Sequence, residues 1–239
     1  MNINILRALA LTGLMALGTA AHASVLYEFY GEDAGGAGSA TMEISIVGNT
    51  LTATVNNTSP TTLLSGTGTN TSAITGFGFD LVSPVPTLQS WTLTALAGDK
   101  TTVTTIGSNG GTGTWVVDGT IGGLNLDFLA CDGSPNCDAI QGALYNPAAT
   151  TGFGAEPNWF TTAVLTLNFA TAPELDAFLG DGTCTGPSPC SPFVRFQNVG
   201  LNGDGSLRLP GVSVPEPATL ALLGLGLLGL AAIRRRHAM

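Results

Sequence analysis

The four cysteines of this 239-residue chain form two pairs with the same spacing. Five residues separate Cys131 from Cys137 and Cys184 from Cys190, and Gly and Pro occur in both intervals. An even cysteine count indicates disulfides if the chain is exported, as its amino-terminal segment predicts below, and the simplest of the three connectivities closes each pair on itself. Cross-pairing and a four-thiolate zinc site are the alternatives. Redox catalysis is not indicated, because it calls for Cys-x-x-Cys and an acidified thiol.

Other catalytic chemistry would have to use carboxylates. The two histidines, His22 and His237, lie near the ends of the chain, which argues against a Ser-His-Asp or Cys-His site in the body. All sixteen acidic residues lie between residues 24 and 217, but no pair of them stands out by its spacing as the acid and base of a glycosidase. We therefore predict a non-enzymatic protein without a cofactor.

Two acidic loops place oxygen ligands at alternate positions, as calcium loops do. They are residues 202–206, in which Asn202 and Asp204 are the candidate ligands, and residues 132–138. Neither completes the EF-hand series, which requires a glutamate at the twelfth position. Polar turns between strands explain both loops, so no metal is predicted.

Aromatic and threonine side chains suggest a binding alternative. Trp91, Trp115 and Trp159 could stack on sugars in a glycan-binding or carbohydrate-active module, although core positions are favoured. Repeated Thr-x-Thr could order water on a flat strand face, as ice-binding surfaces do. Threonine also favours strands for steric reasons alone.

The elements that would position these residues are mainly strands. Residues 42–55 alternate apolar and polar types on either side of Gly48 and Asn49, which predicts a β-hairpin. Further strands are expected in residues 25–30, 74–82, 90–96, 101–106, 113–119, 124–130, 162–169 and 193–199. A proline-led acidic segment from Ala172 predicts one short helix. The body, residues 24–209, is therefore predicted to be all-β, an antiparallel β-sandwich of jelly-roll-like type.

The amino-terminal segment reads as an export signal. Arg7 precedes an apolar stretch, and small residues at Ala21 and Ala23 frame the expected cleavage after Ala23. The predicted signal peptide, residues 1–23, implies the Sec translocon and signal peptidase as partners. The segment from 24 to 217 keeps three basic residues against all sixteen acids, so it offers no basic patch for nucleic acid.

Residues 210–239 combine three features in a fixed order. Pro215, Glu216 and Pro217 cannot continue a helix, because proline lacks an N–H and favours extended backbone before it. An uncharged apolar stretch, residues 218–233, predicts a transmembrane helix that is short for a bilayer. Arg234, Arg235 and Arg236 follow and would stay cytoplasmic, which places the body outside.

This tail resembles the PEP-CTERM sorting signal of Gram-negative bacteria, also catalogued as the ice-binding protein C-terminal domain. The resemblance covers motif, apolar helix and arginine cluster, and its catalogue name does not imply ice binding by this chain. It implies that an exosortase recognises Pro215, Glu216 and Pro217 and cuts near them. The family accompanies exopolysaccharide and biofilm production, which makes exopolysaccharide an implied partner.

The resulting hypothesis is a disulfide-stapled surface or extracellular-matrix protein. It would be held briefly at the inner membrane and then sorted to the cell surface or exterior. A permanently anchored envelope protein is the alternative that differs only in the fate of the tail.

Overall fold

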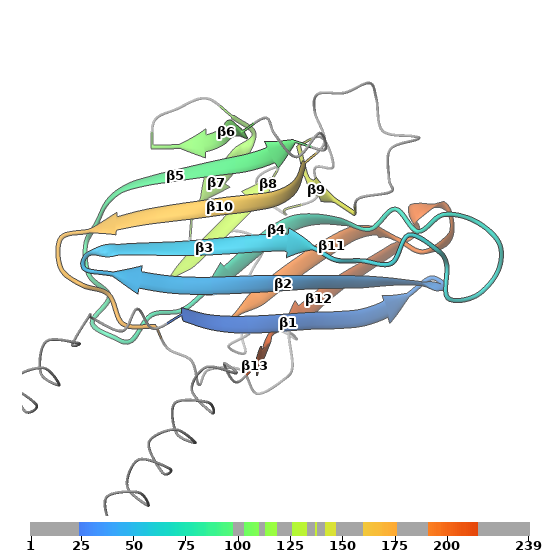
Figure 1. The fold of residues 1–239 in the computed structure, drawn as a ribbon, viewed down its shortest axis with the longest axis horizontal. Coiled ribbons are helices and arrows are strands. Elements are labelled where there is room, and N and C mark those ends of the chain that lie inside the picture. Colours follow the sequence, from blue (N-terminus) through green and yellow to red (C-terminus); the bar gives the residue numbers. More distant parts are fainter. Residues whose placement is uncertain are drawn as a thin grey trace, which may run out of the picture.

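The computed structural model describes residues 24–97, 103–109, 113–118, 126–132, 137, 142–146, 160–175 and 191–214. Most of these residues belong to strands (Figure 1). Six strands lie next to one another in the order β6, β5, β10, β3, β2, β1. Their bounds are Val103–Ser108, Leu88–Ala97, Phe160–Phe169, Thr50–Asn57, Gly36–Val47 and Ser24–Asp33.

A second group of strands has the order β12, β11, β4, β8, β7. Their bounds are Gly205–Pro210, Phe193–Val199, Ala73–Phe79, Phe128–Asp132 and Trp115–Val117. The two-residue strand β9, Leu144–Tyr145, pairs with both β4 and β10 and so joins the groups. The last strand, β13, Val212–Val214, pairs with the outer edge of β1. The thirteen strands of the described ranges thus form one connected, mostly antiparallel sheet.

Buried apolar side chains of both groups belong to one hydrophobic core. Strands β3 and β10 alternate buried and half-buried residues, as expected where one face of a strand meets a core. Gly31 and Gly38 lie opposite each other on β1 and β2. A Cβ on Gly31 would lie 2.6 Å from Leu209, and one on Gly38 would lie 2.8 Å from Phe196. These glycines therefore let β11 and β12 approach β1 and β2 closely.

The β2–β3 hairpin turns in two residues. Val47 faces Thr50 across the ladder, and Gly48 has φ +58° with nothing within 4 Å of the position of a Cβ. A glycine at positive φ in the first central position suits the twist of an antiparallel hairpin. This turn fixes the register that puts Leu51, Ala53 and Val55 in the core.

The all-β prediction is confirmed, and so are the predicted hairpin and the strands expected at the remaining eight positions. The finer prediction of a jelly-roll-like sandwich is not confirmed, because the strand pairing is continuous through β9. The predicted helix from Ala172 is wrong over residues 172–175. This stretch is not helical, and Leu175 forms a β-bridge with Leu81. Its continuation lies outside the described residues.

Three strands were not predicted, namely β9, β12 and β13. Strand β9 has two residues, and β12 lacks a clean alternation of buried and exposed positions. The described sheet also extends through Val214, past the predicted end of the body at residue 209.

The buried side chain of Asn70 joins several segments by hydrogen bonds at one end of this sheet. Asn70 Nδ2 donates to the carbonyl oxygens of Ala37 and Pro60, each at 2.7 Å. Its Oδ1 accepts from Gly200 N at 3.0 Å and from Ser72 Oγ at 2.9 Å. One fully buried side chain therefore ties β2 to the turn after β11 with its amide groups satisfied.

Candidate functional site at the carboxyl end of the sheet

The chain leaves the sheet through β13, which lies beside β1 in Figure 1. Val214 faces Leu26, Ser213 faces Tyr27 and Val212 faces Glu28, in an antiparallel ladder. Val212 is 70% exposed, and Val214 is half-buried. Strand β13 is therefore short and contributes little buried apolar area.

Gly211 anchors the start of this strand. Its backbone N–H donates to Pro192 O at 2.8 Å. A Cβ at Gly211 would lie 2.8 Å from both the Phe29 ring and Pro192. Glycine is thus needed where the chain passes closely over the core from β12 to β13.

The motif predicted for sorting follows without a linker. Val214 is the last paired residue in the described part of the chain, and Pro215 is next in the sequence. Proline cannot donate to a ladder, so a sheet would be expected to stop at such a position. Residues Pro215, Glu216 and Pro217 themselves lie outside the described residues, as does the basic cluster at Arg234, Arg235 and Arg236.

The predicted signal cleavage after Ala23 and the sorting motif at residues 215–217 both lie close to the β1–β13 ladder in the sequence. Ser24, the residue after the predicted signal cleavage, begins β1, and Leu26 faces Val214. Ala21 and Ala23 lie outside the described residues. Among the described residues, no helix has the length and apolar character needed to cross a bilayer. The predicted span at 218–233 is not among them.

The tail matches a known family. Residues 213–236 match the family model described as the PEP-CTERM protein-sorting motif. The chain is therefore a protein with a carboxyl-terminal sorting signal. Residues 213–236 specifically carry a PEP-CTERM sorting motif, and this motif implies exosortase-dependent sorting of an exported protein to the cell surface. Searches of curated proteins and of solved structures found no match to the chain.

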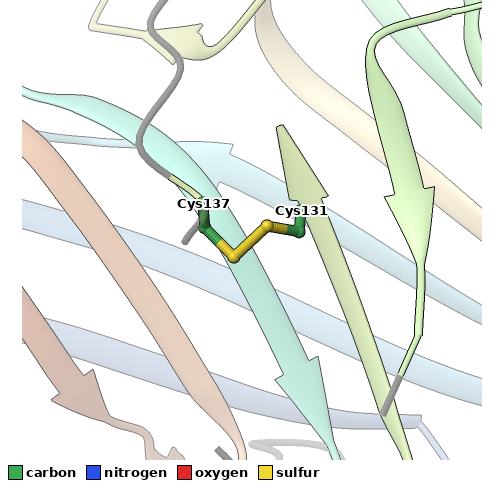
Figure 2. The surroundings of a disulfide bond; sticks show 2 residues. All are labelled: Cys131 and Cys137. Atoms are coloured by element: carbon green, nitrogen blue, oxygen red, sulfur yellow. A yellow bond between two sulfur atoms is a disulfide. The ribbon is translucent and has the colours of Figure 1, made fainter. Parts of the chain in front are cut away.

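One predicted cysteine pair lies within the described residues. Cys131 and Cys137 are joined by a disulfide with a Cα–Cα separation of 4.9 Å, and Figure 2 shows the bridge from Cys131 of β8 to Cys137 beside β4. A Cβ on Gly76 of β4 would lie 3.1 Å from Cys137 Sγ, so this glycine makes room for the bridge. Cys184 and Cys190 lie outside the described residues.

Beside the disulfide, Asp132 ends β8 with its side chain fully buried. Neither carboxylate oxygen has a hydrogen-bond partner among the described residues. Burial raises the pKa of Asp132 to about 6. The nearby Thr114 hydroxyl offsets part of that rise without meeting the geometry of a full hydrogen bond. Burial, followed by the charge on Asp132, raises the pKa of Tyr145 to about 12.

One acidic side chain lies beside the calcium-candidate loop 202–206, since Asp33 Oδ2 accepts from Ser206 N at 2.9 Å. Asn202 has φ +58° within the short 3-10 segment η2, Leu201–Gly203, and both Asn202 and Asp204 are exposed. Asp132 is buried in a different part of the sheet. Over the described part of the chain, no three His, Cys, Asp or Glu side chains gather as a metal site.

The tryptophans that could stack on a sugar take core positions where they are described. Trp115 is 2% exposed, donates from Nε1 to Gly142 O at 3.0 Å and packs on Phe77. Trp91 is half-buried and packs against the core. Trp159 lies outside the described residues.

The threonine repeats meet in a row that sequence reading did not assemble. Six residues face one another across β1, β2, β3, β10, β5 and β6, and every one carries a hydroxyl: Ser24, Ser45, Thr52, Thr166, Thr92 and Ser108. Neighbouring strands are about 4.8 Å apart, so the row extends for roughly 24 Å. None of the six is buried, because they occupy the outward face of these strands.

Proposed function

We propose that this chain is an exported, non-enzymatic structural protein of the cell surface or extracellular matrix. The observation that carries the proposal is the match at residues 213–236, which begins within β13. The tail holds the chain at the inner membrane after Sec export, and an exosortase then cuts near residues 215–217. Cleavage breaks one peptide bond, and the acyl group passes to water on release or to an acceptor nucleophile on attachment.

The composition of the body supports a structural role. Histidine occurs only at positions 22 and 237, so removal of both ends would leave a body without imidazole. The acidic body would stay soluble and would repel anionic lipid. Disulfides within each loop, at Cys131 with Cys137 and at Cys184 with Cys190, would stabilise the body outside the cell.

The processing proposal is tested by producing the full chain in a host that makes an exosortase and in the same host lacking that enzyme. Changing Pro215, Glu216 and Pro217 together to alanine should leave the full-length chain in the membrane fraction of both hosts. A wild-type chain that stays full-length in the exosortase-containing host would overturn the proposal and favour the permanently anchored envelope protein.

Binding of a neutral polysaccharide is the second candidate, because the hydroxyl row offers a regular set of hydrogen-bonding groups without basic side chains. We expect Thr52→Val with Thr166→Val to lower retention on immobilised neutral polysaccharide at least fivefold. Valine keeps the shape and the strand preference of threonine. The control is Thr87→Val in an exposed loop. Equal retention of all three proteins would rule out this face.

A further inference from the structure

We propose that β13 is a releasable strand that controls cleavage of the tail: the exosortase acts only after residues 212–214 have separated from β1. This inference rests on the proposed processing of the tail. It concerns a step that precedes cleavage, and it assigns to Val212 and Val214 a positioning role.

In the sequence, no residue separates β13 from the sorting motif. Val214 is paired with Leu26, and the motif starts at the following residue. Proteins that bind an extended peptide commonly use its backbone edges and its alternate side chains. One edge of β13 is already paired with β1, and β1 is backed by β2. An enzyme that surrounds the residues before the motif would therefore collide with β1 and β2.

Separation of β13 from β1 should cost little free energy. Strand β13 has three residues, two of which are exposed, and Val212 is 70% exposed. Short edge strands with little buried apolar area open at the low end of the stability range of a protein. The rest of the sheet does not depend on this ladder, because β1 also forms a ten-residue ladder with β2.

The separation of β13 from β1 is expected to end at Gly211. Gly211 is held by its hydrogen bond to Pro192 O and by close packing on Phe29. Strand β12, which precedes it, is paired with β11 from Gly205 to Pro210. Separation of β13 would therefore stop at Gly211 and extend the reach of the motif by three residues, while the core stays closed.

The test pins β13 to β1 with an engineered disulfide, Leu26→Cys with Val214→Cys, at a facing pair of the ladder. Full-length chains in exosortase-containing membranes are followed by intact mass, oxidised and after mild reduction, with the wild type treated in the same way. The oxidised pinned chain should be processed at least tenfold more slowly than wild type. Reduction should return it to within about twofold.

Two further variants distinguish two explanations for slow processing of the pinned chain. One is that β13 cannot leave β1, and the other is that the substitutions damage the site that the enzyme recognises. Four residues of Gly and Ser inserted between Val214 and Pro215 should restore processing of the oxidised pinned chain. Val212→Gly, which lowers strand preference, should speed processing about threefold, whereas Val103→Gly at a similarly exposed valine of β6 should not.

Processing of the oxidised pinned chain at the wild-type rate would overturn the inference and leave the proposed function standing. Failure of the wild type itself to be processed would overturn the proposed function. We expect Val212→Gly and Val103→Gly to differ in processing rate. Identical processing rates for both variants and for wild type would therefore also count against a releasable strand.

Discussion

Asp132 shows how one residue can set a pH dependence of stability. Its carboxyl is buried without a hydrogen-bond partner among the described residues, and burial raises its pKa to about 6 from an ordinary value of 3.8. The folded state therefore holds the proton more tightly than the unfolded state. As a result, the free energy of unfolding falls as the pH rises between about 4 and 6, and the full penalty is present above that window.

Asp132→Asn should remove this penalty. We expect the variant to be about 1–2 kcal/mol more stable than wild type at pH 7.5 and to lose most of the slope between pH 4 and 6. Urea unfolding at pH 4.5 and 7.5, with disulfides intact, measures both quantities. A variant that is less stable than wild type at pH 7.5 would show that the ionised carboxylate has a stabilising partner.

At the scale of elements, close approach between strand and turn explains why some glycines are needed. A Cβ on Gly36, at the start of β2, would lie 2.4 Å from Gly200 Cα and 2.5 Å from Gly200 N. Both neighbouring atoms belong to the backbone, so the contact cannot be relieved by a change of rotamer. Gly36→Ala should lower the free energy of unfolding by about 3 kcal/mol.

The matched control for Gly36 is Gly48→Asn in the β2–β3 turn. That position has φ +58° and open space around it, and asparagine tolerates such a conformation. Urea unfolding of both variants should show a loss for Gly36→Ala that is at least twice the loss for Gly48→Asn. Equal stability of Gly36→Ala and wild type would contradict the close packing of β2 on the turn after β11.

The elements also show how far the sequence could predict the fold. Strands such as β3 and β10 were predictable because one face is buried and the other faces water, which leaves a period of two. The segment from Ala172 carries helix-start signals, yet Leu175 pairs with Leu81, a distant partner that local patterns do not report. Strand β13 was missed because Val212 and Val214 flank one serine and form too short a pattern.

Only part of the candidate site could be predicted, again because local sequence patterns do not report pairing between distant residues. Pro215, Glu216 and Pro217 are recognisable because the sorting motif is contiguous in sequence. Their attachment to β1 depends on pairing between residues near opposite ends of the chain, such as Leu26 with Val214. The hydroxyl row likewise required the register of six strands, although each Thr-x-Thr repeat was visible by itself.

For the whole molecule, the first and last strands of the described sheet lie next to the segments that we propose are removed. Strand β1 begins at Ser24, directly after the predicted signal peptide, and β13 ends directly before the sorting motif. The two strands are paired with each other. Removal of both terminal segments would therefore leave a sheet whose first and last strands hold together the ends of the body.

The most direct test is the intact mass of the protein recovered from the surface of an exosortase-containing host, supported by peptide mapping of both ends. We predict a chain that begins at Ser24 and ends at or before Pro217, with the apolar segment and the three arginines removed. Recovery of surface protein that still ends at Met239 would contradict this prediction.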